Sequence, residues 1–241
     1  MVEKLRNMGY PGRVIILGAD QSNNPIAIYA ITGRSPSSQA RIMEIGKSHS
    51  IVYVRPTDEK TIKEGNIDLL IYKAIISGKG VAVSNGKQTD DIFNYMLATS
   101  EQVLPRRVLI DTLKNWEYEP DAPNFTPRIN GVINLQGNLG ALGIIKKQDD
   151  NTARDYYEFA LQAGQGKLIA TYIGHNVNPL PSFKGEPLDV ELKFNCIGDA
   201  VAAVYDFLAP KEGMPDFRVS VAGYSRTTNG PMISIKNRHQ R

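Results

Sequence analysis

The sequence predicts an α+β fold in which helices pack on stacked antiparallel sheets. Short β-like runs recur along the chain, and the connections between them are mostly short and rich in turn-forming residues. Helical periodicity is confined to the middle of the chain and one later segment, so the strand-helix-strand rhythm of a parallel sheet is missing. We find no internal repeat, low-complexity segment or composition break. We therefore expect one domain spanning residues 1–241.

Predicted strands crowd the first third of the chain. They cover residues 13–17, 26–31, 51–55, 68–75 and 80–83. The stretch 19–25, between the first two strands, contains Asp, Asn and Pro, which favour a reversal of the chain. We therefore expect sequential antiparallel pairing that begins with a hairpin.

The middle of the chain changes to a helical pattern. Thr89 is the expected N-cap of one helix, and Asp90 and Asp91 follow it, where carboxylates meet unpaired amide donors. A second helix is predicted over residues 105–116, with apolar side chains on one face. We expect both apolar stripes to pack against a sheet.

The remainder of the chain returns to predicted strands. They cover residues 128–135, 139–145, 156–161, 167–173, 217–222 and 232–235, with a helix over 198–208. Cys196 has no histidine near it in sequence, so we expect a buried and inert thiol. The basic tail, residues 236–241, is expected to be frayed and solvated, with contact to an anionic partner as the alternative.

Composition excludes several classes of protein. Hydrophobic residues make up 41% and charged residues 22% of the chain, as in globular proteins, and 28 Lys+Arg against 25 Asp+Glu leave a net charge of +3, too small for a general nucleic-acid binder. One cysteine and three histidines show no zinc-ligand spacing, and no run approaches the roughly 18 apolar residues of a membrane span. Residues 1–6 lack the apolar core of a signal peptide. We therefore expect a cytoplasmic protein without metal, cofactor, nucleic-acid or membrane partner.

Four polar clusters stand in turn-like stretches, where binding groups commonly lie. They are residues 10–13, 33–41, 83–90 and 118–128. The second contains Arg34, Ser35 and Arg41, whose guanidinium and hydroxyl donors suit phosphate oxygens. A solvated serine-rich loop explains the same composition equally well.

The third and fourth clusters also have two interpretations each. Residues 83–90 run through an Asn-Gly turn to a helix N-terminus that presents amide donors, or they form a plain capped turn. Three prolines hold residues 118–128 rigid, so Glu119 and Arg128 belong either to a site or to a structural salt bridge. The sequence contains no Gly-x-Ser-x-Gly elbow, P-loop or Gly-x-Gly-x-x-Gly fingerprint.

Taken together and in this order, the clusters resemble the IMP cyclohydrolase family first described in archaea, which has bacterial relatives. The resemblance spans roughly residues 9–180. It rests on Tyr10-Pro-Gly-Arg13, Gly33-Arg34-Ser35 through Arg41, Val83-Ser-Asn-Gly86 with Thr89-Asp90, Tyr118-Glu119 with Asn124 to Ile129, and Thr171-Tyr172.

The resemblance implies a four-layer αββα sandwich of antiparallel sheets, similar to the Ntn hydrolases. It implies an enzyme that closes the purine ring of 5-formamidoimidazole-4-carboxamide ribonucleotide (FAICAR) to give IMP and water, without a cofactor. It also implies a homo-oligomer. Ntn hydrolases use an exposed N-terminal Cys, Ser or Thr, and because Val2 follows Met1 we expect no such nucleophile at this end.

The resemblance also suggests roles for single residues. Arg34 and Arg41 are expected to contact the phosphate or an oxyanion, Tyr72 to transfer a proton near the formyl oxygen, and Glu119 to orient or deprotonate the carboxamide. Further expected substrate contacts are Arg13, Ser35, Asn85, Asn124, Thr126 and Arg128. The apolar neighbours of Tyr72 make core packing an equally good explanation of that residue. The spacing from Arg34 to Arg41 is longer than in the archaeal branch, which leaves open which arginine meets which oxygen.

Two other function classes remain consistent with the sequence. One is a non-catalytic protein that binds purine nucleotides and has lost proton transfer. The other is an amidohydrolase of Ntn type, which requires cleavage of the chain before an internal Ser, Thr or Cys.

Overall fold

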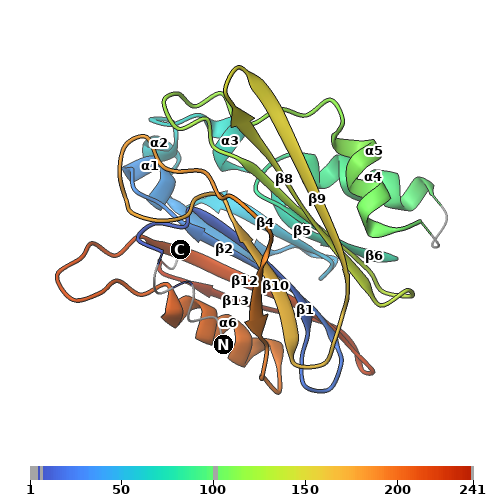
Figure 1. Ribbon diagram of the computed structural model, residues 1–241. Coiled ribbons are helices and arrows are strands. Elements are labelled where there is room, and N and C mark those ends of the chain that lie inside the picture. The colour runs from blue at the N-terminus through green and yellow to red at the C-terminus, as the bar shows by residue number, and fades with distance from the viewer. Residues whose placement is uncertain (1–4, 6–7, 100–102, 240–241) are drawn as a thin grey trace.

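The computed structural model describes residue 5, residues 8–99 and residues 103–239, and its strands form two antiparallel sheets packed face to face (Figure 1). The six-stranded sheet has the order β11-β10-β1-β2-β12-β13. Its strands are β1 Arg13–Ala19, β2 Pro25–Thr32, β10 Gln165–Ala170, β11 Leu188–Glu191, β12 Arg218–Thr227 and β13 Gly230–Asn237. The expected hairpin is confirmed, because β1 pairs with β2 across residues 19–25.

The seven-stranded sheet follows the order of the chain, β3-β4-β5-β6-β7-β8-β9. Its strands are β3 Arg41–Ile45, β4 Ile51–Pro56, β5 Lys73–Ser77, β6 Gly80–Ser84, β7 Arg128–Asn134, β8 Leu139–Gln148 and β9 Asn151–Ala160. Every neighbouring pair is antiparallel, which confirms the predicted sequential pairing for the strands of this sheet. The pairing does not extend from residues 26–31 to residues 51–55, because β2 pairs with β1 and β12 in the other sheet.

Three longer helices cover the outer faces of the two sheets. The helices α4 (Gln88–Ala98) and α5 (Pro105–Leu113) pack on the seven-stranded sheet, and α6 (Ile197–Phe207) packs on the six-stranded sheet (Figure 1). The layers therefore run helix, sheet, sheet, helix, and the predicted α+β sandwich is confirmed. No helix in the described part of the chain combines the length and apolar character needed to cross a membrane.

The main core lies between the sheets. All residues of β1 are buried, and Ile15 and Leu17 point from this strand toward Gly131 of β7. A Cβ atom at residue 131 would lie 3.0 Å from Leu17 Cδ1 of the other sheet, so glycine permits the two sheets to approach closely here. A smaller core, which includes Ile92 of α4 and Leu109 of α5, lies beneath these two helices.

Short elements account for most of the wrong predictions. Residues 68–75 do not form one strand: Asn66 caps a short helix, α3 (Ile67–Leu70), by accepting from the Asp68 amide at 3.1 Å, and β5 starts after it. The sequence also gave no sign of the short helices α1 (Pro36–Gln39) and α2 (Glu59–Ile62), or of the strands β3 and β11. Four or five residues are too few to show a reliable period.

Two predictions at helix starts are wrong. The helix α4 begins after Lys87 without a side-chain cap, and the Thr89 hydroxyl instead contacts the Gly86 carbonyl at 2.8 Å and the Ser84 hydroxyl. Cys196 is exposed rather than buried, because it is the N-cap of α6 and its Sγ accepts from the Asp199 amide at 3.5 Å.

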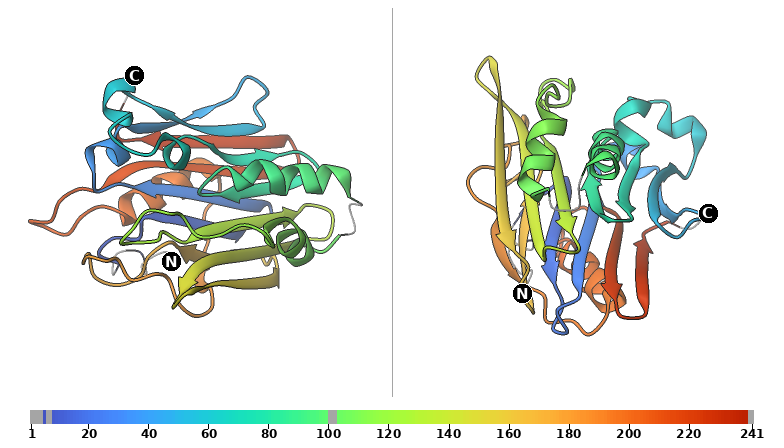
Figure 2. Two further views of the ribbon diagram at one scale, coloured as in Figure 1. Left: turned by 90° about the horizontal axis from the view of Figure 1, so that it is seen from above. Right: turned by 90° about the vertical axis from the view of Figure 1, so that its right-hand side faces the viewer.

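The predicted frayed tail is ordered as far as the structure describes it. Lys236 and Asn237 belong to β13, and the Asn237 side chain bonds both the amide and the carbonyl of Met43, at 2.9 and 3.0 Å. These bonds join β13 to β3, an edge strand of the other sheet (Figure 2). The last two tail residues, 240–241, and most of the N-terminal stretch, 1–4 and 6, lie outside the described residues.

Candidate functional site

A cavity of about 320 Å³ is lined by residues of several loops, of β1 and of the short helices α1 and α3. Its volume lies at the lower end of the range of about 300–1,000 Å³ found for small-molecule sites. The lining comes from five parts of the chain: Tyr10, Arg13; Arg34, Ser35, Ser37, Ser38; Gly65, Asn66, Leu69, Leu70; Glu119, Asp121, Asn124, Thr126; and Tyr172, Leu180. A wider groove of about 790 Å³ beside β10 and β11 contains no buried charged side chain.

The loop before β7 brings Glu119 to the cavity. The Glu119 amide bonds the Thr126 carbonyl at 2.9 Å, and Asp121 accepts from the Thr126 amide at 2.6 Å and from its hydroxyl. The same Thr126 hydroxyl also contacts the Tyr172 hydroxyl, which follows β10 in the other sheet. These contacts fold the proline-rich loop onto itself and hold Glu119 and Thr126 in the wall.

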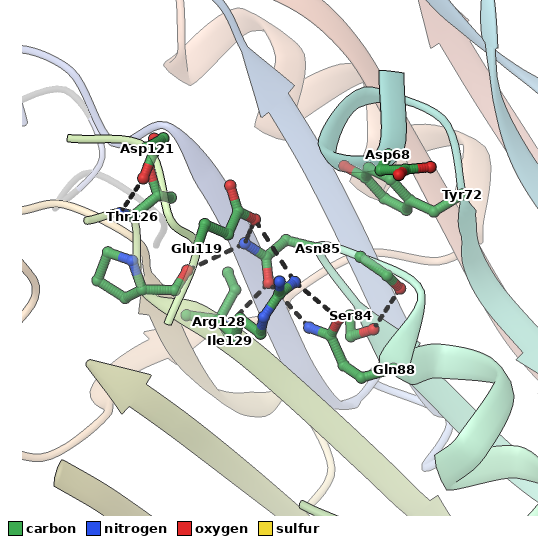
Figure 3. A network of polar contacts seen from close by, with 12 residues as sticks. Asp68, Tyr72, Ser84, Asn85, Gln88, Glu119, Asp121, Thr126, Arg128 and Ile129 are labelled. Atoms are coloured by element: carbon green, nitrogen blue, oxygen red, sulfur yellow. Dashed lines mark hydrogen bonds and ion pairs between the residues drawn. The ribbon is translucent and has the colours of Figure 1, made fainter. Parts of the chain in front are cut away.

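Glu119 is a buried carboxylate among positive charges. Its side chain is 2% exposed, and Oε1 accepts from Asn85 Nδ2 at 3.2 Å and lies 3.9 Å from Arg128 Nη1 (Figure 3). Burial raises its pKa from 4.5 to about 7, and the charges of Arg13, Arg128 and Arg41 oppose that rise. A carboxyl with this pKa exchanges a proton readily near neutral pH.

Two buried arginines lie beside this carboxylate. Arg41 is fully buried; its Nε donates to the Ser38 carbonyl at 2.9 Å, and neither Nη atom has a hydrogen-bond partner among the described residues. The Arg13 Nε also lacks such a partner. Burial and the charge of Arg13 both lower the pKa of Arg41. Buried guanidinium donors of this kind are suited to bind an anion.

The raised pKa of Glu119 predicts how folding stability depends on pH. The folded chain binds the Glu119 proton more tightly than the unfolded chain, so this stabilisation is complete below about pH 4.5 and is lost as the pH rises through about 7. The shift corresponds to about 3 kcal/mol. Urea unfolding at about pH 5 and about pH 8 should therefore show a loss of stability in the wild type that is absent from Glu119→Gln. Equal pH dependence in the two proteins would contradict the raised pKa.

A family model described as "IMP cyclohydrolase-like protein" matches residues 10–228. The chain belongs to this family. It is 31% identical over 188 residues to an IMP cyclohydrolase of Methanopyrus kandleri, a match covering 78% of this chain and 86% of the relative. An IMP cyclohydrolase of Methanococcus maripaludis is 27% identical over 171 residues, covering 70% of this chain and 77% of the relative.

In this member of the IMP cyclohydrolase-like family, the cavity brings together six residues predicted from the sequence. They are Arg13, Arg34, Ser35, Glu119, Asn124 and Thr126. Arg34 is half-buried at the rim, where Nη1 donates to Asn176 Oδ1 at 2.9 Å and the guanidinium lies 5.1 Å from the Tyr10 ring centre. The Ser35 hydroxyl caps α1 by accepting from the Ser38 amide at 3.2 Å.

The other predicted residues lie behind the lining. Asn85 and Arg128 are buried next to Glu119, and Arg41 lies beneath the wall that Ser38 forms. Tyr72 belongs to the main core, and its hydroxyl is 2.6 Å from that of Tyr29. Figure 3 shows the Tyr72 ring apart from the cluster around Glu119. In this structure, therefore, the core-packing interpretation describes the surroundings of Tyr72.

Several lining residues had been assigned no role. Tyr10 and Tyr172 stack with ring centres 6.0 Å apart, and both stand in the motifs that carry the family resemblance, so their positions were available from the sequence. Asn66 and Leu69 come from the segment wrongly predicted as loop and strand, and no sequence signal pointed to them.

Proposed function

We propose that the chain is an IMP cyclohydrolase that closes the ring of FAICAR to give IMP and water. The observation that carries this proposal is the meeting of Arg13, Arg34 and Glu119 in one cavity of a chain that the IMP cyclohydrolase-like model matches over residues 10–228. A buried carboxylate with a pKa of about 7 beside guanidinium groups suits a reaction that moves protons and develops charge on oxygen.

The reaction needs positioning more than a covalent nucleophile. The carboxamide nitrogen attacks the formyl carbon, a carbon–nitrogen bond forms, and the formyl oxygen leaves as water. One proton of that water comes from the carboxamide nitrogen and the other from the formamide nitrogen. Both groups sit on one ring, so orientation can supply part of the roughly 7–11 kcal/mol available to well-placed intramolecular reactions.

The geometry suggests different roles for Glu119 and the three arginines. Glu119 accepts the carboxamide proton, while Arg13 and Arg41, desolvated beside it, stabilise the charge that develops on the formyl oxygen. Arg34 binds the phosphate, because its guanidinium lies at the rim of the cavity, where a bound phosphate stays in contact with water and keeps part of its hydration. The proposal therefore assigns Arg34 to the phosphate, and Arg13 and Arg41 to the formyl oxygen.

The remaining predicted residues take different places in the proposal. Asn124 and Thr126, which line the cavity, contact the ring edge, and Ser35 lies beside the phosphate. Asn85 and Arg128 act on Glu119 from behind. Tyr72 as the proton-transfer group stays a prediction, because its hydroxyl pairs with Tyr29 and its side chain is not part of the lining.

The direct test is to incubate the purified protein with FAICAR, without added metal, and to follow the formation of IMP. Ring closure well above the uncatalysed rate is expected. Nucleotide binding without ring closure would favour the non-catalytic alternative. A chain cleaved before an internal Ser, Thr or Cys, visible by intact-mass measurement, would favour the amidohydrolase.

Replacing Arg34 by Ala should weaken the binding of both FAICAR and IMP by about tenfold, because both carry the phosphate, while kcat changes little. Steady-state kinetics with IMP as product inhibitor measures both affinities. Arg55→Ala, which removes an exposed guanidinium outside the cavity lining, is the matched control. A loss confined to kcat would refute the phosphate assignment.

The proposal extends to the fold family, the oligomeric state and the location of the protein. The helix-sheet-sheet-helix layer order supports a sandwich of the Ntn-hydrolase kind. The homo-oligomer, the single domain over residues 1–241 and the cytoplasmic location stay predictions, and sedimentation velocity tests the first of them.

A further inference from the structure

Two buried side-chain amides connect Glu119 to the protein interior. Asn85 and Gln88 are both fully buried at the junction of β6 and α4. Asn85 Oδ1 accepts from the Ile129 amide at 2.8 Å and from Gln88 Nε2 at 3.3 Å. Asn85 Nδ2 donates to the Pro127 carbonyl at 3.0 Å and to Glu119 Oε1 at 3.2 Å (Figure 3).

The chemistry of the partners fixes the orientation of both amides. The backbone N–H of Ile129 can only donate, so the Asn85 oxygen must face it and the Asn85 NH₂ group must face Glu119. Gln88 then has to turn its NH₂ group toward the Asn85 oxygen. Its own oxygen consequently accepts from Arg128 Nη1, at 3.2 Å.

The backbone at Gly86 is matched to this arrangement. A Cβ atom at residue 86 would lie 2.5 Å from Gln88 Oε1 and 2.8 Å from Arg128 Nη1. Both distances are shorter than real contacts allow, so a glycine here makes room for the bond between Gln88 and Arg128.

We propose that Gln88 is a positioning residue that holds Asn85 and Arg128 where they orient Glu119 for proton transfer. This role rests on the proposed function. Asn85 and Arg128 both approach Oε1 of Glu119, while Figure 3 shows its other carboxylate oxygen without a hydrogen bond or ion pair to the residues drawn. Asn85 and Arg128 thus engage one carboxylate oxygen of Glu119 and leave the other to receive the substrate proton.

Gln88 also keeps the guanidinium of Arg128 apart from the carboxylate of Glu119. Arg128 is anchored by its Nε bond to the Glu117 carbonyl at 2.8 Å and by its stacking over Trp116 at 5.0 Å. Without the Gln88 acceptor, Nη1 is left with Glu119 Oε1, at 3.9 Å, as a nearby acceptor, and we expect this gap to close. The other charged groups that act on Glu119 are Arg13 of β1, Arg41 of β3 and Asp121 of its own loop.

Two substitutions should shift the Glu119 titration in opposite directions. Gln88→Met removes the acceptor, lets Arg128 approach the carboxylate and lowers its pKa by about half a unit or more. Gln88→Glu keeps an acceptor for Arg128 but adds a negative charge, which raises the pKa of Glu119 by a similar amount. Both variants should lower kcat severalfold and shift the pH dependence of kcat in the same directions as the pKa.

The titration is measured by NMR on protein labelled with carbon-13 at the glutamate carboxyls, with Glu119→Gln identifying the signal. This titration is measured without turnover. A wild-type protein that does not close the ring would overturn the proposed function, and the effect of Gln88 on the Glu119 titration would still be tested. The control is Asn130→Leu, which removes another fully buried amide whose side chain, among the described residues, donates only to the Arg128 carbonyl, at 3.3 Å. The control should leave the titration unmoved.

Shifts of opposite sign in the two Gln88 variants support the positioning role. Unmoved titrations, or shifts of the same sign, overturn it, because a residue that only supports the fold has no reason to separate the two variants. If Gln88→Met does not fold, Gln88→Ala, which also removes the acceptor, takes its place, with a lowered pKa of Glu119 as the required result.

Discussion

Replacing Glu119 by Gln should lower kcat by at least about tenfold and by up to about 10⁴-fold, the range of general acid–base catalysis, while nucleotide affinity stays within about threefold. Glutamine has the shape of glutamate, so the loop bond from the Glu119 amide to the Thr126 carbonyl is retained. The substitution removes a proton acceptor whose pKa burial has raised to about 7. Steady-state kinetics and IMP calorimetry separate the two effects.

A neighbouring glutamate provides the matched control for this experiment. Glu117 is exposed, outside the cavity lining and two residues away, so Glu117→Gln should leave kcat unchanged. Unchanged activity of Glu119→Gln would remove Glu119 from the mechanism. Loss of nucleotide binding in that variant would indicate a binding group rather than a base.

Replacing Arg41 by Met should stabilise the ligand-free protein and weaken nucleotide binding. The guanidinium is fully buried, two of its nitrogens lack partners among the described residues, and Arg13 repels it. An apolar side chain of similar length removes that unfavourable charge, so we expect the free energy of unfolding to rise by about 1–2 kcal/mol. Affinity for IMP should fall by at least about tenfold, because a desolvated positive charge behind the cavity wall is lost.

Urea unfolding without ligand measures the free energy of unfolding, and calorimetry with IMP measures the affinity. Arg106→Met is the control, since Arg106 is an exposed arginine of α5 outside the cavity lining. It should change neither quantity. An Arg41→Met protein that loses stability and keeps its affinity would show that Arg41 serves the fold rather than the ligand.

The predictions from sequence succeeded where local signals were long. The β1–β2 hairpin and the helices α4, α5 and α6 all contain many residues with a consistent apolar period, and their observed bounds differ from the expected ones by a few residues only. The helices within residues 59–70 were not predicted because four-residue helices have no measurable period. Their N-caps, Asp58 and Asn66, are of residue types that are common in turns as well. Of these two helices, α3 nevertheless contributes Leu69 and Leu70 to the cavity wall, beside Gly65 and its N-cap Asn66.

In the candidate site, too, some residues could be predicted from the sequence and others could not. Motif order along the chain was enough to select Arg13, Arg34 and Glu119, because guanidinium and carboxylate groups in turn-like stretches are chemically informative wherever they stand. Tyr72 was ambiguous because its apolar neighbours in sequence fit a core position and a site position equally well, and its hydroxyl pairs with Tyr29. Gln88 stood in the polar cluster 83–90 but was assigned no role, since its partner Arg128 lies 40 residues away in the sequence.

Local chemistry along the chain was therefore sufficient for the class of fold, the sequential antiparallel pairing of one sheet and the family resemblance. Packing between distant segments placed Arg41 beneath the wall, Tyr72 in the core and Glu119 among three arginines. Burial, charge repulsion and hydrogen-bond geometry depend on distances between residues far apart in sequence. A pattern of residue types does not contain those distances, so the properties of the buried carboxylate emerged with the folded structure.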